Sequence, residues 1–228
     1  MRILIINPNT TASMTEAIGI AAAKAASTGT TILAVNPEDG PASIQGPEDG
    51  EAALPGLFVV FDRYMKGDDR FDAVIVACFD DTGLTELRAR SKVPITGIGE
   101  AAYRLAAETA APFSVVTTLA VSIPVLEYNI KSYGLAVDCA RVRASEIPVL
   151  DLEQHPGRAL TRIGSEIAMA IKNDQCRSIV LGCAGMADMA QVLEKTYSVP
   201  VIEGVGAAVA WCESKVAASL VDTETDNP

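Results

Sequence analysis

Short runs of apolar residues alternate along the chain with longer segments in which apolar residues recur every three or four positions. A short run bounded by Gly, Pro, Asn or Asp indicates a strand buried on both faces, whereas the longer spacing indicates an amphipathic helix. The pattern predicts strands at residues 2–6, 31–35, 72–77, 94–96, 112–116, 142–147, 178–182 and 200–202. It predicts helices at residues 13–25, 51–66, 83–91, 99–110, 121–133, 156–173, 185–196 and 205–219. This alternation favours parallel sheet covered by helices.

The order of elements and several local motifs occur twice in the chain. Four pairs of landmarks lie at nearly the same separation: Cys78 and Cys183, residues 93–95 and 199–201, Asn7 and Thr117, and the Gly-x-Gly segments at 97–99 and 204–206. We therefore expect an α/β protein with two similar Rossmann-like domains, each with a four-stranded parallel sheet, and an active site in the cleft between them. The predicted first domain comprises residues 1–97 with 208–228, and the second comprises residues 98–207.

Composition narrows the class of protein. Of the 228 residues 49% are hydrophobic, so the chain can bury a large core. The formal net charge of -11 argues against nucleic acid or an anionic membrane as a partner. No apolar run approaches the roughly 18 residues that span a bilayer, and the N-terminal run is too short for a signal peptide. We expect a cytoplasmic protein whose five cysteines are reduced.

Several kinds of site are excluded by what the chain lacks. His155 is its only histidine, which excludes a multi-His metal site. No Gly-x-Ser-x-Gly elbow and no Cys-x-x-Cys pair occurs, which argues against a serine hydrolase and a thioredoxin-like site. Neither Gly-x-Gly segment continues into a dinucleotide fingerprint. We therefore expect neither a metal nor a cofactor.

The two duplicated cysteines are the strongest candidates for chemistry. Cys78 and Cys183 each follow a buried strand, and open α/β sheets bind ligands at the carboxyl ends of their strands. Backbone N–H groups and a helix start near each sulfur would favour the thiolate, whereas Asp80 and Asp81 would oppose it at Cys78. Cys139, Cys176 and Cys212 lack the duplicated placement, and we assign them no role.

Two thiols that face one ligand suit a particular reaction. One thiolate removes a proton from a carbon atom, and the other thiol returns a proton to the opposite face. The stereocentre is thereby inverted. The competing interpretation is that each cysteine is only a small buried apolar residue, but the duplicated placement of the two favours the catalytic interpretation.

Five motifs together resemble the hydantoin racemases of the aspartate/glutamate racemase superfamily: Asn7-Pro8-Asn9-Thr10, Gly40-Pro41-Ala42-Ser43-Ile44, Ala77-Cys78-Phe79-Asp80-Asp81, Ser114-Val115-Val116-Thr117-Thr118 and Leu181-Gly182-Cys183-Ala184-Gly185. The resemblance extends from residue 1 to about residue 215. It implies two α/β domains with the site between them, racemisation without a cofactor, a small-molecule substrate and a homo-oligomer. Cys78 and Cys183 match the two catalytic cysteines of the family.

The neighbours of these cysteines differ from those in the amino-acid racemases of the superfamily. Those relatives have Asn-Thr after the first cysteine and Thr-His after the second, where this chain has Phe79-Asp80 and Ala184-Gly185. The difference favours a neutral cyclic diamide over a free amino acid. The candidate substrate-binding residues are Asn7, Ser43, Phe79, Thr117, Thr118, Ala184 and Gly185, the last two through backbone N–H groups that would stabilise an enolate oxygen.

Several functions remain open at the level of sequence. The leading hypothesis is racemisation of 5-substituted hydantoins, and its close rival is racemisation of allantoin, a hydantoin with a ureido group at C5. Asp80 and Asp81 favour allantoin, whereas Phe79 and Ile44 favour an apolar substituent. The remoter alternatives are an amino-acid racemase, a decarboxylase, a cis–trans isomerase and a protein that only binds a small metabolite.

Overall fold

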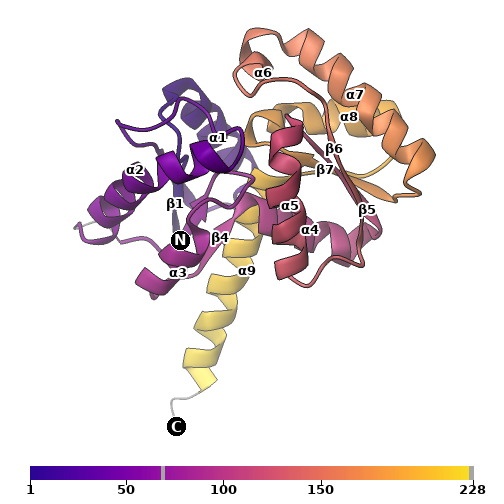
Figure 1. The fold of residues 1–228 in the computed structure, drawn as a ribbon. Helices are drawn as coiled ribbons and strands as arrows, with labels where there is room; N and C mark the ends of the chain where they lie inside the picture. Colours follow the sequence, from indigo (N-terminus) through magenta and orange to yellow (C-terminus); the bar gives the residue numbers. More distant parts are fainter. Residues whose placement is uncertain (68–69, 226–228) are drawn as a thin grey trace.

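The computed structural model describes residues 1–67 and 70–225 and contains two four-stranded parallel sheets (Figure 1). The strand order is β2-β1-β3-β4 in the first sheet and β6-β5-β7-β8 in the second. The strands are β1 (Arg2–Ile6), β2 (Thr31–Val35), β3 (Ala73–Val76), β4 (Ile95–Gly97), β5 (Phe113–Thr117), β6 (Cys139–Ala144), β7 (Ser178–Gly182) and β8 (Val201–Glu203). Because the same order occurs twice, the predicted duplicated α/β fold is confirmed.

Helices separate the strands and cover both faces of each sheet, as Figure 1 shows. The first half contains α1 (Ala12–Ala25), α2 (Pro47–Met65) and α3 (Leu84–Arg90). The second half contains α4 (Ile98–Ala110), η1 (Ala120–Ser122), α5 (Ile123–Ser132), α6 (Asp151–Gln154), α7 (Pro156–Asn173), η2 (Ala184–Met189) and α8 (Ala190–Tyr197), and α9 (Gly204–Thr225) ends the described chain.

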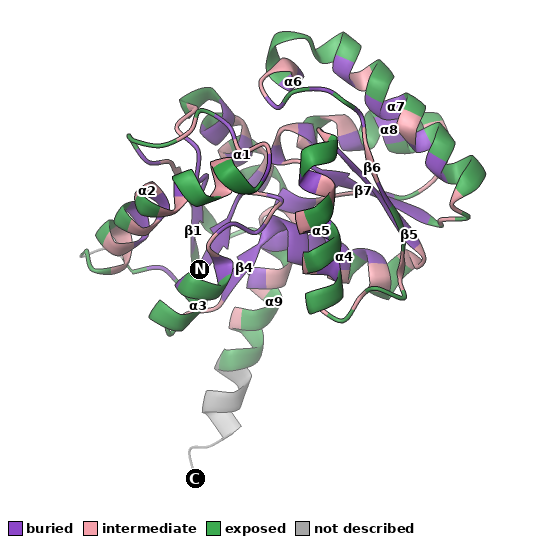
Figure 2. Ribbon diagram, viewed as in Figure 1, coloured by how far each residue is buried: buried purple, intermediate pink, exposed green. Residues whose placement is uncertain are grey.

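Three apolar clusters form the core, and alternate residues of each strand enter different clusters. In β1, Ile3 and Ile5 face a central cluster, whereas Leu4 and Ile6 pack against α2 and α3. The second sheet repeats this arrangement, with its outer cluster under α7 and α8. Strands buried on both faces explain the continuous apolar runs of the sequence, and Figure 2 shows the buried strands within a shell of more exposed helices. The central cluster contains residues of both halves.

Helix α9 joins the two halves. It contacts α1, β3 and β4 of the first half, and also α4, β7 and β8. Its C-terminal part extends away from the two sheets (Figure 1). The domain boundaries given above, 1–97 with 208–228 and 98–207, therefore stay a prediction, and residues 68, 69 and 226–228 lie outside the described part of the chain.

Some predicted boundaries were wrong. The helix expected at residues 51–66 begins at Pro47, because Pro is favourable in the first turn and Glu48 and Asp49 follow it there. The strand expected at 142–147 is β6, at Cys139–Ala144. Arg143 makes this strand look polar, but its guanidinium donates to both carboxylate oxygens of Asp174 at 2.6 Å.

Candidate active site

Cys78 lies near the start of the turn between β3 and α3. The chain leaves β3 at Val76, and α3 begins only at Leu84. Asp81 and Gly83 adopt left-handed backbone angles, with φ of 52° and 70°, and the Asp81 N–H donates to the carbonyl oxygen of Cys78 at 3.0 Å. The Cys78 sulfur accepts hydrogen bonds from the Thr82 hydroxyl at 3.4 Å and from the Asp80 N–H. The turn thus supplies the polar neighbours of this sulfur.

The side chain of Asp81 holds the turn in place. Its carboxylate accepts hydrogen bonds from the N–H groups of Gly99 and Glu100 at 3.0 and 2.8 Å and from the Tyr133 hydroxyl at 2.8 Å. A Cβ atom at Gly97 would overlap this carboxylate, which explains the first Gly-x-Gly segment. Asp81 therefore has a structural role between β3, α4 and α5.

The second half anchors the same turn through Asn129 of α5. Its amide nitrogen donates to the carbonyl oxygen of Asp80 at 2.8 Å. The first cysteine is thus positioned by contacts from both halves of the molecule.

Cys183 follows β7 directly and precedes the short 3-10 helix η2. Its sulfur accepts a hydrogen bond from the Gly185 N–H. The Thr117 hydroxyl donates to the carbonyl oxygen of Gly182 at 3.0 Å and so ties the end of β5 to the end of β7. A Cβ atom at Gly185 would lie 2.9 Å from a terminal carbon of Leu152.

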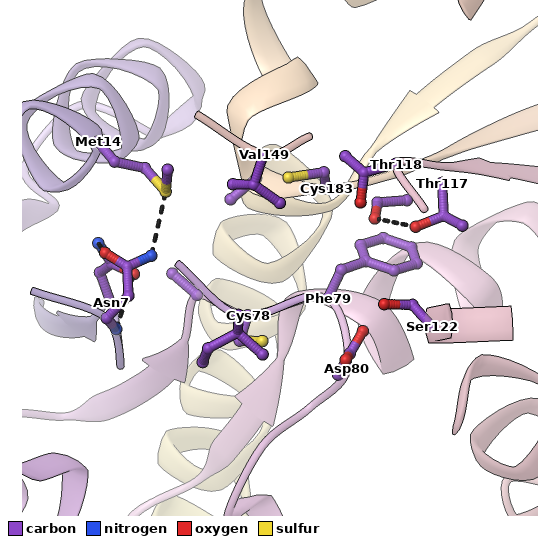
Figure 3. A pocket seen from close by; sticks show the side chains of 15 residues that line it. Asn7, Met14, Cys78, Phe79, Asp80, Thr117, Thr118, Ser122, Val149 and Cys183 are labelled. Carbon is purple, nitrogen blue, oxygen red and sulfur yellow. Dashed lines mark hydrogen bonds between the residues drawn. The ribbon is translucent and has the colours of Figure 1, made fainter. Parts of the chain in front are cut away.

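Cys78 and Cys183 line one pocket where the two halves meet (Figure 3). The pocket is narrow, with a cavity volume of about 30 Å³ for a water-sized sphere, which is room for one or two water molecules. A substrate ring therefore enters only when the walls move apart. Of the predicted binding residues, the following line the pocket: Asn7, Phe79, Thr117, Thr118 and Ala184. Ser43 and Gly185 do not line it, although Ile44 does.

The polar lining residues differ in how many hydrogen-bonding groups they have available. The Asn7 amide nitrogen donates to Asn9 Oδ1 at 2.9 Å and to Thr15 Oγ1 at 3.0 Å, so both of its N–H bonds are used within the protein. The hydroxyls of Thr118 and Ser122 make no side-chain hydrogen bond within the described part of the chain. These two hydroxyls are available to a ligand.

Sequence reasoning missed several lining residues. Asn9 has a signal, because it belongs to the same polar motif as Asn7, and its amide donates only to the Met14 sulfur, at 3.2 Å. Ser122 and Val149 have none, because η1 and the segment after β6 bring them to the pocket from regions without a distinctive motif. The positions of Ser122 and Val149 in the pocket lining thus depend on tertiary packing.

Burial dominates the ionisation of both thiols. It raises the pKa of Cys183 to about 11 and raises the pKa of Cys78 further. The charge of Asp80 raises both values, and Asp81 adds to the effect at Cys78, whereas the hydrogen bonds to each sulfur lower them. Burial also raises the pKa of Asp80 to about 7. No Lys, Arg or His side chain is among the described residues of this pocket, so both thiols are neutral at pH 7.

Residues 1–67 and 70–225 contain no group of three or more His, Cys, Asp or Glu side chains that could hold a metal ion. None of the helices in these ranges has the length and apolar character needed to cross a bilayer.

Known proteins resemble this chain along nearly its full length. The family model described as Asp/Glu/hydantoin racemase matches residues 3–212. A hydantoin racemase of Rhizobium meliloti is 40% identical over 99% of this chain and 93% of its own, and one of a Pseudomonas species is 41% identical over 95% and 86%. The solved structure of an allantoin racemase from Klebsiella pneumoniae superposes with a TM-score of 0.92 at 41% identity, over 96% of this chain and 89% of that one.

Proposed function

Since the chain belongs to the Asp/Glu/hydantoin racemase family and is therefore an isomerase, we propose that it racemises 5-substituted hydantoins by proton transfer between Cys78, Cys183 and the C5 atom. The observation that carries the proposal is the presence of both thiols in one pocket, each at the carboxyl end of a corresponding strand in the two sheets. Figure 3 shows the two side chains approaching this pocket from different sides.

The proposed reaction balances without a cofactor. One thiolate takes the proton from C5, and the C–H electron pair moves to the adjacent carbonyl oxygen to give an enolate. The other thiol then donates its proton to the opposite face of C5, and the carbonyl forms again. At the end the two cysteines have exchanged protonation states, so the enzyme is ready for the opposite enantiomer.

The pocket walls supply groups that suit a cyclic diamide. The hydroxyls of Thr118 and Ser122 and the amide of Asn9 have unused donors for the ring carbonyls, and Phe79 offers a flat apolar surface. The Ala184 N–H is our candidate for stabilising the enolate oxygen. The Gly185 N–H is bound to the Cys183 sulfur, so we propose that it stabilises the thiolate.

Three of the predicted binding residues have a weaker case. Asn7 braces Asn9 with both of its N–H bonds, and the Thr117 hydroxyl hydrogen is bound to Gly182, so each retains only acceptor capacity toward a substrate. Ser43 lies outside the lining, and its predicted role depends on the resemblance to the family alone.

Allantoin is a second candidate substrate. The observation that favours it is the carboxyl group of Asp80, which lines the pocket and makes no hydrogen bond within the described residues. A ureido group at C5 carries N–H groups that would donate hydrogen bonds to such a carboxylate.

Polarimetry on enantiopure benzylhydantoin and allantoin, measured side by side, tests the proposal. We expect the optical rotation of at least one compound to decay to zero, with incorporation of deuterium at C5 in heavy water. The matched control is Cys176→Ser, which removes a partly buried thiol outside the pocket and should leave the rate unchanged. No decay and no exchange above the uncatalysed rate for either compound would contradict the proposal.

Two further features complete the proposal. We expect activity to survive dialysis against a chelator, because the scheme needs no metal or cofactor. We also expect a homo-oligomer, as the resemblance to the family implies, and light scattering coupled to gel filtration measures its mass.

A further inference from the structure

Asp80 lies between two cavities. It lines the thiol pocket, and it also lines a second, outer hollow of about 220 Å³ formed by α2, the turn before α3, and α5. No other described residue lines both. The outer hollow includes Thr82, whose hydroxyl is bound to the Cys78 sulfur. Asp80 is therefore the described residue that the thiol pocket shares with a space large enough for several water molecules.

The backbone of Asp80 is fixed, but its carboxyl group has no partner. Its carbonyl oxygen accepts from Asn129, and its N–H donates to the Cys78 sulfur. The carboxyl oxygens make no hydrogen bond or ion pair within the described residues. The adjacent Asp81 differs, since its carboxylate accepts three hydrogen bonds. A partly buried carboxyl group without a partner, held beside two thiols, is poorly explained by a role in folding.

Among the described residues that line the two cavities around Asp80, none carries a cationic side chain. The titratable side chains that face it from the neighbouring elements are Cys78, Cys183, Asp81 and Tyr103 on the inner side and Glu51 and Glu86 on the outer side. A thiolate formed beside an ionised Asp80 would therefore place two adjacent negative charges in a buried site without compensation. Transfer of the thiol proton to Asp80 forms a thiolate and keeps the charge of the cluster constant.

We propose, on the basis of the two-thiol function above, that the Asp80 carboxylate accepts the proton of one thiol at the start of a catalytic cycle and exchanges that proton with water in the outer hollow. In this step the S–H bond breaks and an O–H bond forms on the carboxyl group, and the electron pair stays on sulfur. Asp80 exchanges this proton with water in the outer hollow one for one, so the charge of the cluster does not change, and it returns a proton to the thiolate at the end of the cycle. Asp80 thus acts through the thiols and does not itself touch C5.

The proposal predicts a coupled titration of Asp80 and the thiols. While Asp80 already carries a proton, it cannot accept another, so the thiolate fraction rises as Asp80 ionises, near its pKa of about 7. Above that pH the ratio of thiolate to thiol is constant until the thiols ionise independently. Alkylation of Cys78 and Cys183 by iodoacetamide, measured by peptide mass spectrometry, should therefore rise in two steps with a plateau between them.

The closing experiment compares the wild type with Asp80→Asn, Asp80→Glu and Glu86→Gln. Asp80→Asn should convert the alkylation profile to a single alkaline step and lower kcat/KM at neutral pH by about 100-fold, with partial rescue by added formate or acetate. Asp80→Glu keeps a carboxyl group and should keep the two steps. Glu86→Gln makes the same change of charge on the outer wall and should leave both readouts unchanged.

Two results would overturn the proposal. One is a single-step alkylation profile in the wild type, a result that does not depend on whether any variant folds. The other is an Asp80→Asn variant with undiminished activity and a thiol profile shifted to lower pH, because Asp80 would then only repel the thiolates. Alkylation needs no substrate, so a correct profile without racemisation would contradict the proposed function but not the role of Asp80.

Discussion

The two cysteine-bearing strand ends occupy equivalent places in the two sheets, but they differ in chemistry. Cys78 lies in a long turn that contains Asp80 and Asp81, whereas Cys183 is followed at once by η2 and the N–H of Gly185. Burial, and after it the charge of the acidic turn, raises the pKa of Cys78 further than that of Cys183, which is about 11. Duplication thus produced two matched positions, and the sequences that diverged around them made the thiols unequal.

The comparison shows that the two thiols of such a site need not ionise equally. The direction that starts from a Cys183 thiolate has the base that ionises more readily, and the opposite direction depends on Thr82 and the turn. The turn itself depends on α4 and α5, through the hydrogen bonds that Asp81 and Asp80 accept. The first thiol is therefore the one whose environment is most sensitive to the contact between the halves.

Removing either thiol should have the largest effect. Cys78→Ser and Cys183→Ser each leave one face of C5 without its acid or base, because a serine hydroxyl is far less acidic than a thiol. We expect racemisation to fall by at least about 1,000-fold in both variants, measured by polarimetry. Cys212→Ser, at a buried cysteine in α9, is the control for a general effect of losing a thiol. Equal loss of activity in that control would weaken the argument.

Gly97→Ala should have the next largest effect, because it acts on the Cys78 end alone. The added methyl group would overlap the Asp81 carboxylate and displace the turn that carries Cys78. We expect a loss of about 2 kcal/mol in the free energy of unfolding, measured by urea denaturation. Gly185→Ala has its one close contact, at 2.9 Å, with the flexible end of Leu152 and should cost less. The opposite ranking would show that the Asp81 brace is not what holds the turn.

The pH dependence of thiol reactivity compares the two ends directly. Both pKa values are raised, so independent ionisation of the thiols lies at alkaline pH, near 11 for the Cys183 pKa and higher for that of Cys78. At mildly alkaline pH we expect iodoacetamide to modify Cys183 at least about tenfold faster than Cys78, since each unit of pKa difference changes the thiolate fraction tenfold. Peptide mass spectrometry separates the two products. Faster modification of Cys78 would reverse the comparison.

Thr82→Val should have the smallest of these effects. It removes the hydroxyl that donates to the Cys78 sulfur and nearly preserves the shape of the side chain. Loss of a hydrogen bond of about 1 kcal/mol should raise the pKa of Cys78 and lower kcat in one direction about fivefold more than in the other. Because the two enantiomers have equal free energy, kcat/KM stays equal in the two directions, so KM should change in step with kcat. Full saturation curves from each pure enantiomer separate kcat from KM, and an equal change of kcat in both directions would show that Thr82 does not act on Cys78 alone.

Much of the fold was predictable from the sequence, because parallel strands buried on both faces are continuous apolar runs. The end of β7 before Cys183 followed from such a run and is where it was expected. The start of α2 was missed, because its first turn, from Pro47, consists of residues that also favour loops. The position of β6 was missed because Arg143 is paired with Asp174, a contact between residues distant in sequence.

The candidate site was predictable where duplication marked it. The repeated strand ends identified Cys78 and Cys183, and both line the same pocket. Ser122 and Val149 reach that pocket by tertiary packing alone, so no local pattern indicated them. The different roles of Asp80, whose carboxyl group lines the pocket, and Asp81, whose carboxylate braces the turn, were also not predictable from the sequence. They depend on which of the two adjacent carboxylates lies near the hydrogen-bond donors Gly99 and Tyr133.

The most direct test of the account is deuterium exchange at C5 in the single-cysteine variants. Each enantiomer of the better substrate is incubated in heavy water with Cys78→Ser or Cys183→Ser, and proton NMR follows the C5 signal. The account predicts that each variant exchanges the proton of only one enantiomer, that the two variants choose opposite enantiomers, and that neither inverts its substrate. A variant that exchanges both enantiomers, or that still racemises at the wild-type rate, would contradict the assignment of one thiol to each face of C5.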